Sequence, residues 1–397
     1  MHPSASIRSL KSRALEGKRI VLGITGSIAA VESFELAREL IRHGAEVHTV
    51  MTPEALKLVT PWAMQFATGN EVVTEIDGRV QHVSLLGDYP DKADLLLIAP
   101  CTANTLSKVA LGIDDTTVTT MATVALGSGV PVLVAPAMHL AMFNHPMVRQ
   151  NTKVLGEMGV EFIGPHTVGK KARIASVEDI VMAVLRRLGR RDLEGKRILV
   201  IGGSSEEPID RIRVVTNNGT GETAVRMATA AFLRGADVEL WAGRMLVPVP
   251  QFLKSRRFTR VEDLLDMVED IDHDAVIVPA ALSDYAPVAV KDKIPSGRKE
   301  LEVKMKGLPK VLPAVRKKAG VVVGFKAEVG VSEQELVRRA RVRLEEHRLD
   351  MIVANDFTDV REGVTKAILV TAESEVPFEG SKSDLSDRVL DEVLGRL

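Results

Sequence analysis

Disulfides, strong net charge and long apolar runs are all missing from this 397-residue sequence. The single cysteine, Cys101, excludes an intrachain disulfide, so nothing in the composition points to an oxidising compartment. Lys and Arg number 52 against 53 Asp and Glu, which leaves no basic excess for nucleic acid or an anionic membrane. No apolar run approaches the roughly 18 residues of a membrane helix, and the basic N-terminal segment has no signal-peptide core. We therefore expect a cytoplasmic protein with small-molecule partners, no nucleic acid and no membrane.

Two segments of the chain are nearly copies of one another. Residues 15–27 read LEGKRIVLGITGS, and residues 193–205 read LEGKRILVIGGSS. In each, a β-branched apolar run ends in a Gly/Ser turn, after which we expect a helix. This is how a first strand enters a nucleotide-binding α/β domain, because glycines permit a tight turn and free N–H groups at the helix start face a phosphate. The sequence therefore predicts two tandem Rossmann-like α/β domains.

After the first turn, the chain continues with an alternation of expected helices and strands. Residues 28–43 place apolar side chains on one helical face, and residues 47–51 read as the second strand. The tripeptide Thr52-Pro53-Glu54 has the pattern of another helix start. His82 lies in a short segment between turn residues, where spacing alone favours a surface or core role over a catalytic one.

Two later apolar runs are typical of parallel strands buried on both faces. They cover residues 93–100 and 130–135, and each ends in a distinctive loop, Cys101-Thr-Ala-Asn-Thr and Pro136-Ala-Met-His. Open α/β sheets bind ligands at the carboxyl ends of their strands, so we expect one crevice at these loops. Cys101 itself is interpreted as a small packing residue.

A charged, polar stretch at residues 189–192 separates the two halves, and we expect domains 1–190 and 191–397. In the second half, the Gly/Asn/Thr-rich loop at 216–221 is either a turn before a helix at 222–234 or part of a site. The arginine-rich helix at 333–347 is either a solvated face or a contact to a triphosphate. Further strands are expected at 275–281, 321–325 and 351–354, and a closing helix at 384–397.

Four motifs in the first half resemble the flavin-dependent phosphopantothenoylcysteine decarboxylases. They are GITGSIAA (23–30), HVSL (82–85), ADLLLIAPCTANTLSKVALGIDD (93–115) and APAMHLAM (135–142). The resemblance implies a flavodoxin-like domain that binds FMN, with His82 as a catalytic residue. It places FMN at Gly26, Ser27, Thr52, Thr102, Ala103, Asn104 and Met138.

Two positions of this half depart from the bacterial pattern of that family. His139 stands where the pattern has an asparagine that holds the substrate carboxylate, and a histidine can still donate a hydrogen bond there. The region that matches the family's lid, residues 164–176, has no cysteine, so the proton donor of the decarboxylase is unassigned. The family's decarboxylases are trimeric, which implies a homo-oligomer.

The second half resembles the phosphopantothenate–cysteine ligases, which dimerise. The matching strings include GGSSEEPIDRIRVVTNNGTG (202–221), AALSDY (280–285), VGFKAE (323–328), DMIVAND (350–356) and SKSDLSDRVLDEV (381–393). By resemblance, Asn217 and Arg213 hold the activated acyl intermediate, with Asn217 and Lys293 as catalytic residues. The implied substrate and nucleotide contacts are Arg213, Asn217, Val278, Pro279, Ala280, Asp284, Lys293, Pro309, Lys310, Val311, Leu312, Phe325, Arg343 and His347.

A decarboxylase followed by a ligase is the order of the bifunctional enzymes of coenzyme A biosynthesis. The resemblance implies 4'-phosphopantothenate, cysteine and CTP as substrates, with FMN and Mg²⁺ (or Mn²⁺) as cofactors and unknown metal ligands. Pro295 and Ser296 stand where bacterial members have a run of lysines, and they are nearer the pattern of the ATP-using enzymes. ATP is therefore the alternative nucleotide. The alternatives are a two-domain pyridine-nucleotide oxidoreductase and a non-catalytic regulatory relative of the decarboxylase. Neither half has a full G-x-G-x-x-G with an acidic residue about 20 positions on, which disfavours the former.

Overall fold

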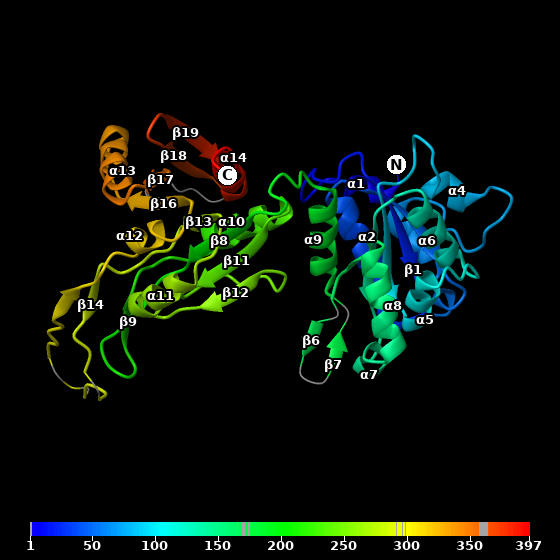
Figure 1. Cartoon of the computed structure of the whole chain (residues 1–397), viewed down its shortest axis with the longest axis horizontal. Coiled ribbons are helices and arrows are strands. Elements are labelled where there is room, and N and C mark those ends of the chain that lie inside the picture. Colours follow the sequence, from blue (N-terminus) through cyan, green and yellow to red (C-terminus); the bar gives the residue numbers. More distant parts are fainter. Residues whose placement is uncertain are drawn as a thin grey trace. The chain divides into compact units, whose positions relative to one another are not determined.

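The computed structural model describes residues 2–164, 166–168, 171–173, 175–290, 292–295, 297, 299–356 and 364–397. Parts of the expected lid (165, 169, 170 and 174) and Ser296 of the expected nucleotide loop lie outside the described residues. The chain forms two compact units, Met1–Gly189 and Arg190–Leu397, which are traced in Figure 1. Among the described residues, no helix combines the length and apolar character needed to cross a membrane.

The first unit is built on a five-stranded parallel sheet in the order β2-β1-β3-β4-β5. Its strands are β1 (Arg19–Ile24), β2 (Glu46–Met51), β3 (Leu95–Cys101), β4 (Val132–Pro136) and β5 (Glu161–Phe162). Every residue of β3 and β4 is buried, as expected for strands covered on both faces. The strand order 2-1-3-4-5 is that of flavodoxin-like folds, whose topological switch point lies between β1 and β3.

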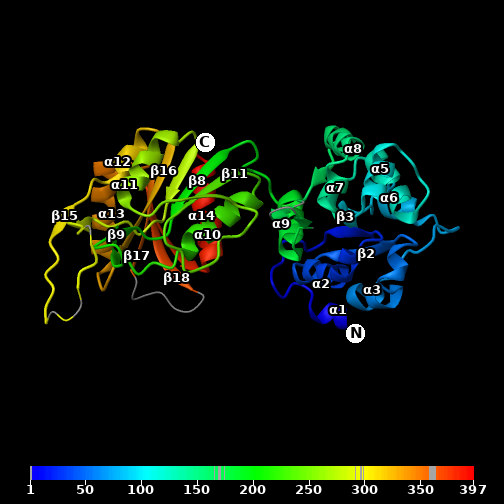
Figure 2. The same cartoon turned by 90° about the horizontal axis from the view of Figure 1, so that it is seen from below.

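Helices cover both faces of this sheet, and Figure 2 shows the sheet between the two layers. One layer contains α2 (Ser33–Arg42), α3 (Pro61–Thr68) and α9 (Val177–Leu188); the other contains α4 (Gln81–Leu86), α5 (Ala103–Ala110), α6 (Thr117–Gly127) and α8 (Pro146–Glu157). Short elements complete the unit: α1 (Pro3–Ser6), η1 (Ile28–Glu32), η2 (Ala55–Lys57), α7 (Leu140–Phe143), β6 (His166–Val168) and β7 (Lys171–Arg173).

The sequence predictions of two helices in this unit need correction. Residues 28–43 do not form one helix: a 3₁₀ turn, η1, precedes α2, because Ile28 and Val31 face solvent while the apolar face of α2 is buried. Thr52 does not open a long helix either. Its main-chain N–H continues the pairing beyond β2 by donating to the Ile24 carbonyl, and only the short η2 follows.

The second unit contains an eight-stranded sheet in the order β12-β11-β8-β13-β16-β17-β18-β19. Its strands are β8 (Arg197–Gly202), β11 (Asp237–Ala242), β12 (Lys254–Arg257), β13 (Ala275–Val278), β16 (Val321–Glu328), β17 (Met351–Asp356), β18 (Thr365–Val370) and β19 (Glu375–Gly380). The strands from β12 to β17 are parallel in the Rossmann order, and β18 and β19 add an antiparallel hairpin.

Two hydrophobic clusters lie on opposite faces of this sheet. One contains residues of α10 (Glu222–Leu233) and α14 (Lys382–Leu394). The other contains residues of α11 (Val261–Met267), η3 (Val268–Asp270), α12 (Val311–Arg316) and α13 (Glu333–His347). Alternate residues of a strand point to opposite faces, so Ile198 and Val200 join the first cluster while Leu199 and Ile201 join the second.

The helix expected at 222–234 is confirmed as α10, but the sequence did not predict the hairpin that lies between the second Gly/Ser turn and this helix. After β8 the chain forms the hairpin of β9 (Glu206–Pro208) and β10 (Val214–Thr216), and α10 begins only at Glu222. The cause is tertiary: the buried Glu207 carboxylate accepts a hydrogen bond from the Val261 N–H, which starts α11 (3.0 Å). A second small sheet pairs β14 (Tyr285–Pro287) with β15 (Met305–Gly307).

Candidate functional site

The turn after β1 approaches the neighbouring chain so closely that only glycine fits at position 26. A Cβ atom on Gly26 would lie 2.4 Å from the Cβ of Glu54. Ser27 then caps η1, its hydroxyl accepting from the Ala29 N–H at 3.4 Å. Gly26 is exposed and Ser27 half-buried, so this backbone faces solvent at the carboxyl end of the strand. A close backbone approach with main-chain N–H groups at a helix start suits a phosphate.

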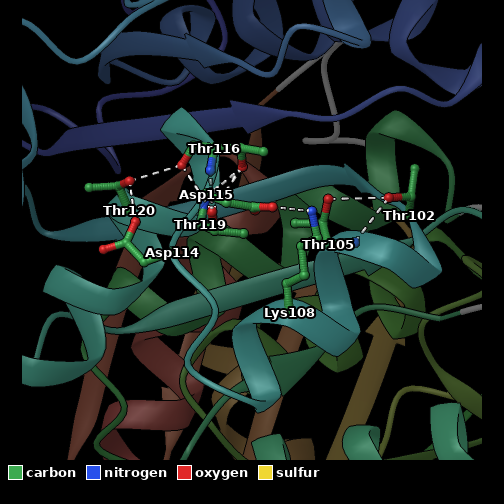
Figure 3. Close-up of polar contacts among 8 residues, drawn as sticks. All are labelled: Thr102, Thr105, Lys108, Asp114, Asp115, Thr116, Thr119 and Thr120. Atoms are coloured by element: carbon green, nitrogen blue, oxygen red, sulfur yellow. Dashed lines mark hydrogen bonds and ion pairs between the residues drawn. The ribbon is translucent and has the colours of Figure 1, made fainter.

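Thr25 joins this turn to the turn after β3. Its buried hydroxyl donates to the Pro100 carbonyl (2.8 Å) and accepts from the Thr102 N–H (3.0 Å). Thr102 in turn caps α5, with its hydroxyl accepting from the Thr105 N–H at 3.2 Å, a contact drawn in Figure 3. The loops that follow β1 and β3 are thus joined by the hydrogen bonds of Thr25.

The other predicted FMN residues lie at the ends of the same sheet. Thr52 follows β2 and is buried, while Ala103 and Asn104 begin α5, with Ala103 nearly buried and Asn104 exposed. Met138, after β4, is half-buried against the hydrophobic cluster that contains Ala103. Because carboxyl ends of parallel strands meet at one edge, these positions share the edge that carries Gly26.

Threonines cap α5 and α6, and an ion pair links α5 to the loop between the two helices, as Figure 3 shows. Thr116 and Thr119 cap α6 reciprocally, and Thr120 bonds to Asp114. Lys108 of α5 forms an ion pair with Asp115 at 2.7 Å. These contacts fix the loop between the two helices at the end of α5.

The two predicted histidines of this half have different surroundings. His82 lies in α4, half-buried, and its Nδ1 is buried without a hydrogen-bond partner in the described part of the chain. His139 is exposed and precedes α7. A buried polar atom without a partner is costly unless a ligand or water meets it, so the His82 ring is the better placed of the two to receive a bound group.

Cys101 is fully buried at the end of β3. Burial raises the pKa of its thiol to about 12. A thiol with that pKa stays protonated and unreactive near neutral pH, in agreement with the packing role interpreted from the sequence.

In the second unit, two clefts open at the carboxyl ends of β8, β13 and β16. The larger, about 460 Å³, is lined by the Gly/Thr loop before α10 and by Pro279, Lys326 and Lys382. The smaller, about 130 Å³, is lined by Asp284, Lys310 and His347 among others. Both are lined by Ala280, Leu282, Phe325 and Arg343.

Most of the predicted ligase residues line these clefts. The smaller cleft is lined by Val278, Ala280, Asp284, Pro309, Lys310, Val311, Leu312, Phe325, Arg343 and His347; Pro279 lines the larger one. Asp284 and Lys310 form an ion pair across the smaller cleft. Burial, followed by the charge of Arg343, lowers the pKa of His347, which favours the neutral form of its ring.

Three predicted residues do not line either cleft. Asn217 lies beside the larger cleft, because its Nδ2 donates to the carbonyl of Ala281, which lines that cleft (2.9 Å). Arg213 forms an ion pair with the buried Asp210, and Lys293 is exposed on the loop that follows β14. Among the described residues, no group of three or more His, Cys, Asp or Glu is arranged to hold a metal ion.

Several cleft residues were missed by sequence reasoning. Lys382 forms an ion pair with Glu222 at 2.6 Å, Lys326 pairs with Glu328 at 2.8 Å, and Asn355 lies nearby on β17. All three stand in strings that the resemblance had matched, which was the available signal. Thr25 was missed too, although it lies within GITGSIAA.

The chain combines a flavodoxin-like unit with a Rossmann-like unit. Each unit has loops or clefts at the carboxyl ends of its parallel strands, where such sheets bind ligands. This combination is typical of a two-domain nucleotide-binding α/β protein. Residues 8–189 match the Flavoprotein family model, and residues 193–396 match that of the DNA/pantothenate metabolism flavoprotein C-terminal domain. The coenzyme A biosynthesis bifunctional protein CoaBC of Thermococcus kodakarensis is 45% identical over 99% of both chains. That of Methanocaldococcus jannaschii is 37% identical over 99% of this chain and 97% of its own.

Among solved structures, the DNA/pantothenate metabolism flavoprotein from Streptococcus pneumoniae is 27% identical, with a TM-score of 0.48, over 51% of this chain and 99% of that one. The sequence matches decide the family. The chain belongs to the coenzyme A biosynthesis bifunctional proteins, which join a phosphopantothenoylcysteine decarboxylase to a phosphopantothenate–cysteine ligase. It is therefore a lyase and a ligase in one chain, and this membership removes the oxidoreductase and regulatory alternatives.

Proposed function

We propose that this chain ligates cysteine to 4'-phosphopantothenate, with CTP as the preferred nucleotide, and then decarboxylates the product with bound FMN. The observation that carries the ligase half is the pair of clefts that share Phe325 and Arg343. A nucleotide has a base and a charged phosphate chain, and adjoining clefts with cationic side chains suit such a molecule. ATP remains the second nucleotide to be tested.

The ligase reaction proceeds in two displacements. A carboxylate oxygen of 4'-phosphopantothenate attacks the α-phosphate, pyrophosphate leaves, and an acyl-nucleotide forms. The amine of cysteine then attacks the acyl carbon, loses a proton and displaces the nucleoside monophosphate. Cations at Lys293 and Arg343 would stabilise the phosphate charge, and the amide of Asn217 would hold the acyl oxygen.

Mg²⁺ or Mn²⁺ would enter with the triphosphate. Mg²⁺ keeps several waters and is bound through one or two carboxylates together with substrate phosphates. A dedicated cluster of protein ligands is therefore not required. Asp284, which lines the smaller cleft beside Lys310, is an available carboxylate.

In the first unit, the residues present fit FMN. The exposed Gly26 turn brings main-chain N–H groups to the start of η1, where they would hold the phosphate, and Ser27, Thr52, Thr102, Ala103, Asn104 and Met138 would surround the remainder. FMN, when bound, supplies reversible two-electron oxidation of the cysteinyl thiol, which makes the adjacent carbon able to accept electrons as CO₂ departs. His82, with its partnerless Nδ1, would move a proton at the cysteinyl group, and His139 would hold the carboxylate.

We further propose that residues 1–190 and 191–397 are the decarboxylase and ligase domains, and that the chain forms homo-oligomers through both. Exposed apolar side chains on the β9–β10 and β14–β15 hairpins and their loops support a dimeric ligase contact: Ile212, Val214, Tyr285, Val288, Val290, Leu301, Val303 and Met305. Exposed Ile28, Val31, Trp62 and Phe66 support a contact of the trimeric decarboxylase.

The nucleotide assignment is tested by measuring pyrophosphate release from the purified full-length protein. 4'-Phosphopantothenate, cysteine and Mg²⁺ are supplied with CTP or with ATP, at matched concentrations. We expect CTP to give the higher kcat/KM, and a higher value with ATP would overturn the preference while leaving the ligase intact. Release that does not depend on 4'-phosphopantothenate would count against the ligase itself.

A further inference from the structure

Asp210, in the turn between β9 and β10, has a side chain completely removed from solvent. Its Oδ1 accepts hydrogen bonds from the main-chain N–H groups of Ile212 and Arg213, both at 2.8 Å. Its Oδ2 accepts from the Ile294 N–H at 3.0 Å and from the Arg213 guanidinium. A carboxylate has only acceptor sites, and each of these partners is a donor.

These bonds connect two loops that are far apart in the sequence. Ile294 is the neighbour of Lys293, and its carbonyl accepts from the Arg213 guanidinium at 3.3 Å. A main-chain bond from the Val290 N–H to the Ile209 carbonyl (3.0 Å) lies between the same two segments. The loop that carries Arg213 and the loop that carries Lys293 are therefore joined through one carboxylate.

Asp210, Arg213 and Ile294, which together join the two loops, lie outside both hydrophobic clusters of the second unit. Ile212, Lys293 and Pro295 around them are exposed, so core packing does not hold these loops in place. The pKa of Asp210 lies far below its usual range, chiefly because of the Ile212 amide, with further contributions from Ile294 and Arg213. The carboxylate is thus charged throughout the working pH range and makes charge-assisted bonds.

We propose that Asp210 is a positioning residue of the ligase, which holds Arg213 and Lys293 in one arrangement for transfer of the nucleotide to the substrate carboxylate. This inference rests on the roles proposed above for Arg213 and Lys293. Asp210 itself, enclosed by its donors, would not touch the substrate. Without it, Lys293 would sample many positions, and a misplacement of about 1 Å can cost roughly 100-fold in rate.

The test is the isosteric variant Asp210→Asn in the full-length protein. Its amide oxygen can still accept from Ile212 and Arg213, but its NH₂ group would face the Ile294 N–H and the guanidinium. We expect pyrophosphate release to fall about 100-fold, as for a misplaced catalytic group. Decarboxylation of supplied 4'-phosphopantothenoylcysteine should stay within about twofold of the parent, since the control reaction belongs to the other unit.

A double variant distinguishes positioning from a general structural role. Because Asp210 acts in part through Lys293, the losses of Asp210→Asn and Lys293→Ala should not multiply, and the double variant should retain more pyrophosphate release than the product of the two single losses. Amide hydrogen exchange provides a readout independent of activity. In Asp210→Asn, the N–H groups of Ile212, Arg213 and Ile294 should exchange faster together, while those of the β8 core remain protected.

Asp350 offers a matched control. Its Oδ2 also accepts from a main-chain N–H, that of Val322 (2.7 Å), and from the guanidinium of Arg316 (2.5 Å). It stands before β17, at the sheet edge opposite the clefts. Asp350→Asn should lower the midpoint of thermal unfolding and leave ligation within about twofold of the parent.

The inference is overturned if Asp210→Asn ligates at nearly the parental rate. It is also overturned if the losses of Asp210→Asn and Lys293→Ala multiply in the double variant, or if the three amides keep their protection. A parental protein that releases no pyrophosphate would instead refute the proposed function, and the exchange experiment would still decide whether Asp210 clamps the two loops.

Discussion

The main-chain N–H of Thr102 donates to the hydroxyl of Thr25 at 3.0 Å, across 77 positions of sequence. The same hydroxyl donates to the Pro100 carbonyl, so the turn after β1 and the turn after β3 are held by one buried side chain. These are the turns that carry the proposed phosphate contacts at Gly26 and Ser27 and the cap of α5. The flavin edge of the first unit therefore depends on a residue that touches no proposed ligand.

Thr25→Val tests this dependence. Valine fills the same space but leaves the Thr102 N–H without its acceptor, which should destabilise the folded first unit by about 1–3 kcal/mol. FMN affinity, measured by the recovery of flavin fluorescence on release, should fall with it. Thr25→Ser keeps the hydroxyl and serves as the control. Equal stability and equal FMN affinity of the two variants would show that the hydroxyl is not needed.

The central strands could be predicted because burial on both faces leaves a continuous apolar run in the sequence. Residues 93–100 and 275–281 correspond to β3 and β13 within a few positions. The repeat of the Gly/Ser turn predicted two α/β units, but not the hairpin inserted after the second one. That hairpin depends on tertiary contacts such as Glu207 with Val261, which no local pattern reports.

The site residues also fall into a group that the sequence predicted and a group that it did not. Those within a matched motif could be named, and many of them line the two clefts. Thr25 and Asp210 could not be assigned a role, although both stand in matched strings. Their partners, Thr102 and Ile294, lie 77 and 84 positions away, so their function is visible only after folding.

His82→Asn should stop CO₂ release from 4'-phosphopantothenoylcysteine while the protein stays yellow and continues to release pyrophosphate. Asparagine keeps much of the hydrogen-bonding reach of imidazole but cannot exchange a proton near neutral pH. The measurement is a decarboxylation time course on flavin-loaded protein. Near-parental decarboxylation would make His82 structural, and His139→Asn would then be the variant to compare.

Lys293→Ala should lower pyrophosphate release by at least about 100-fold, to a residual rate that can still be measured, and leave decarboxylation of supplied 4'-phosphopantothenoylcysteine unchanged. The ammonium is expected to act as a point charge on the nucleotide phosphates, so Lys293→Arg should restore only part of the rate. Lys299→Ala removes the same charge from an exposed position of the same loop and is the matched control. Equal kinetics for Lys293→Ala and Lys299→Ala would exclude Lys293 from the site.

The Cys101 thiol should be inert in the folded protein. With a pKa raised by burial to about 12, only about one thiol in 10⁴ is ionised at pH 8, and the thiolate is the reactive form. Because the chain has one cysteine, a chromogenic disulfide reagent reports on it alone. Reaction should be at least about 100-fold slower in buffer than in denaturant. Rapid reaction in buffer would contradict the packing role of Cys101.

The coupling of the two activities in one chain is tested most directly by following carboxyl-labelled cysteine. The full-length protein is supplied with 4'-phosphopantothenate, CTP and Mg²⁺, and labelled CO₂ and pyrophosphate are measured together. Both reactions are needed to move the label from cysteine to CO₂, so we expect the two products in a one-to-one ratio at completion. Omission of the nucleotide or of 4'-phosphopantothenate should eliminate both. Labelled CO₂ without the nucleotide, or pyrophosphate without labelled CO₂ from flavin-loaded protein, would contradict the account.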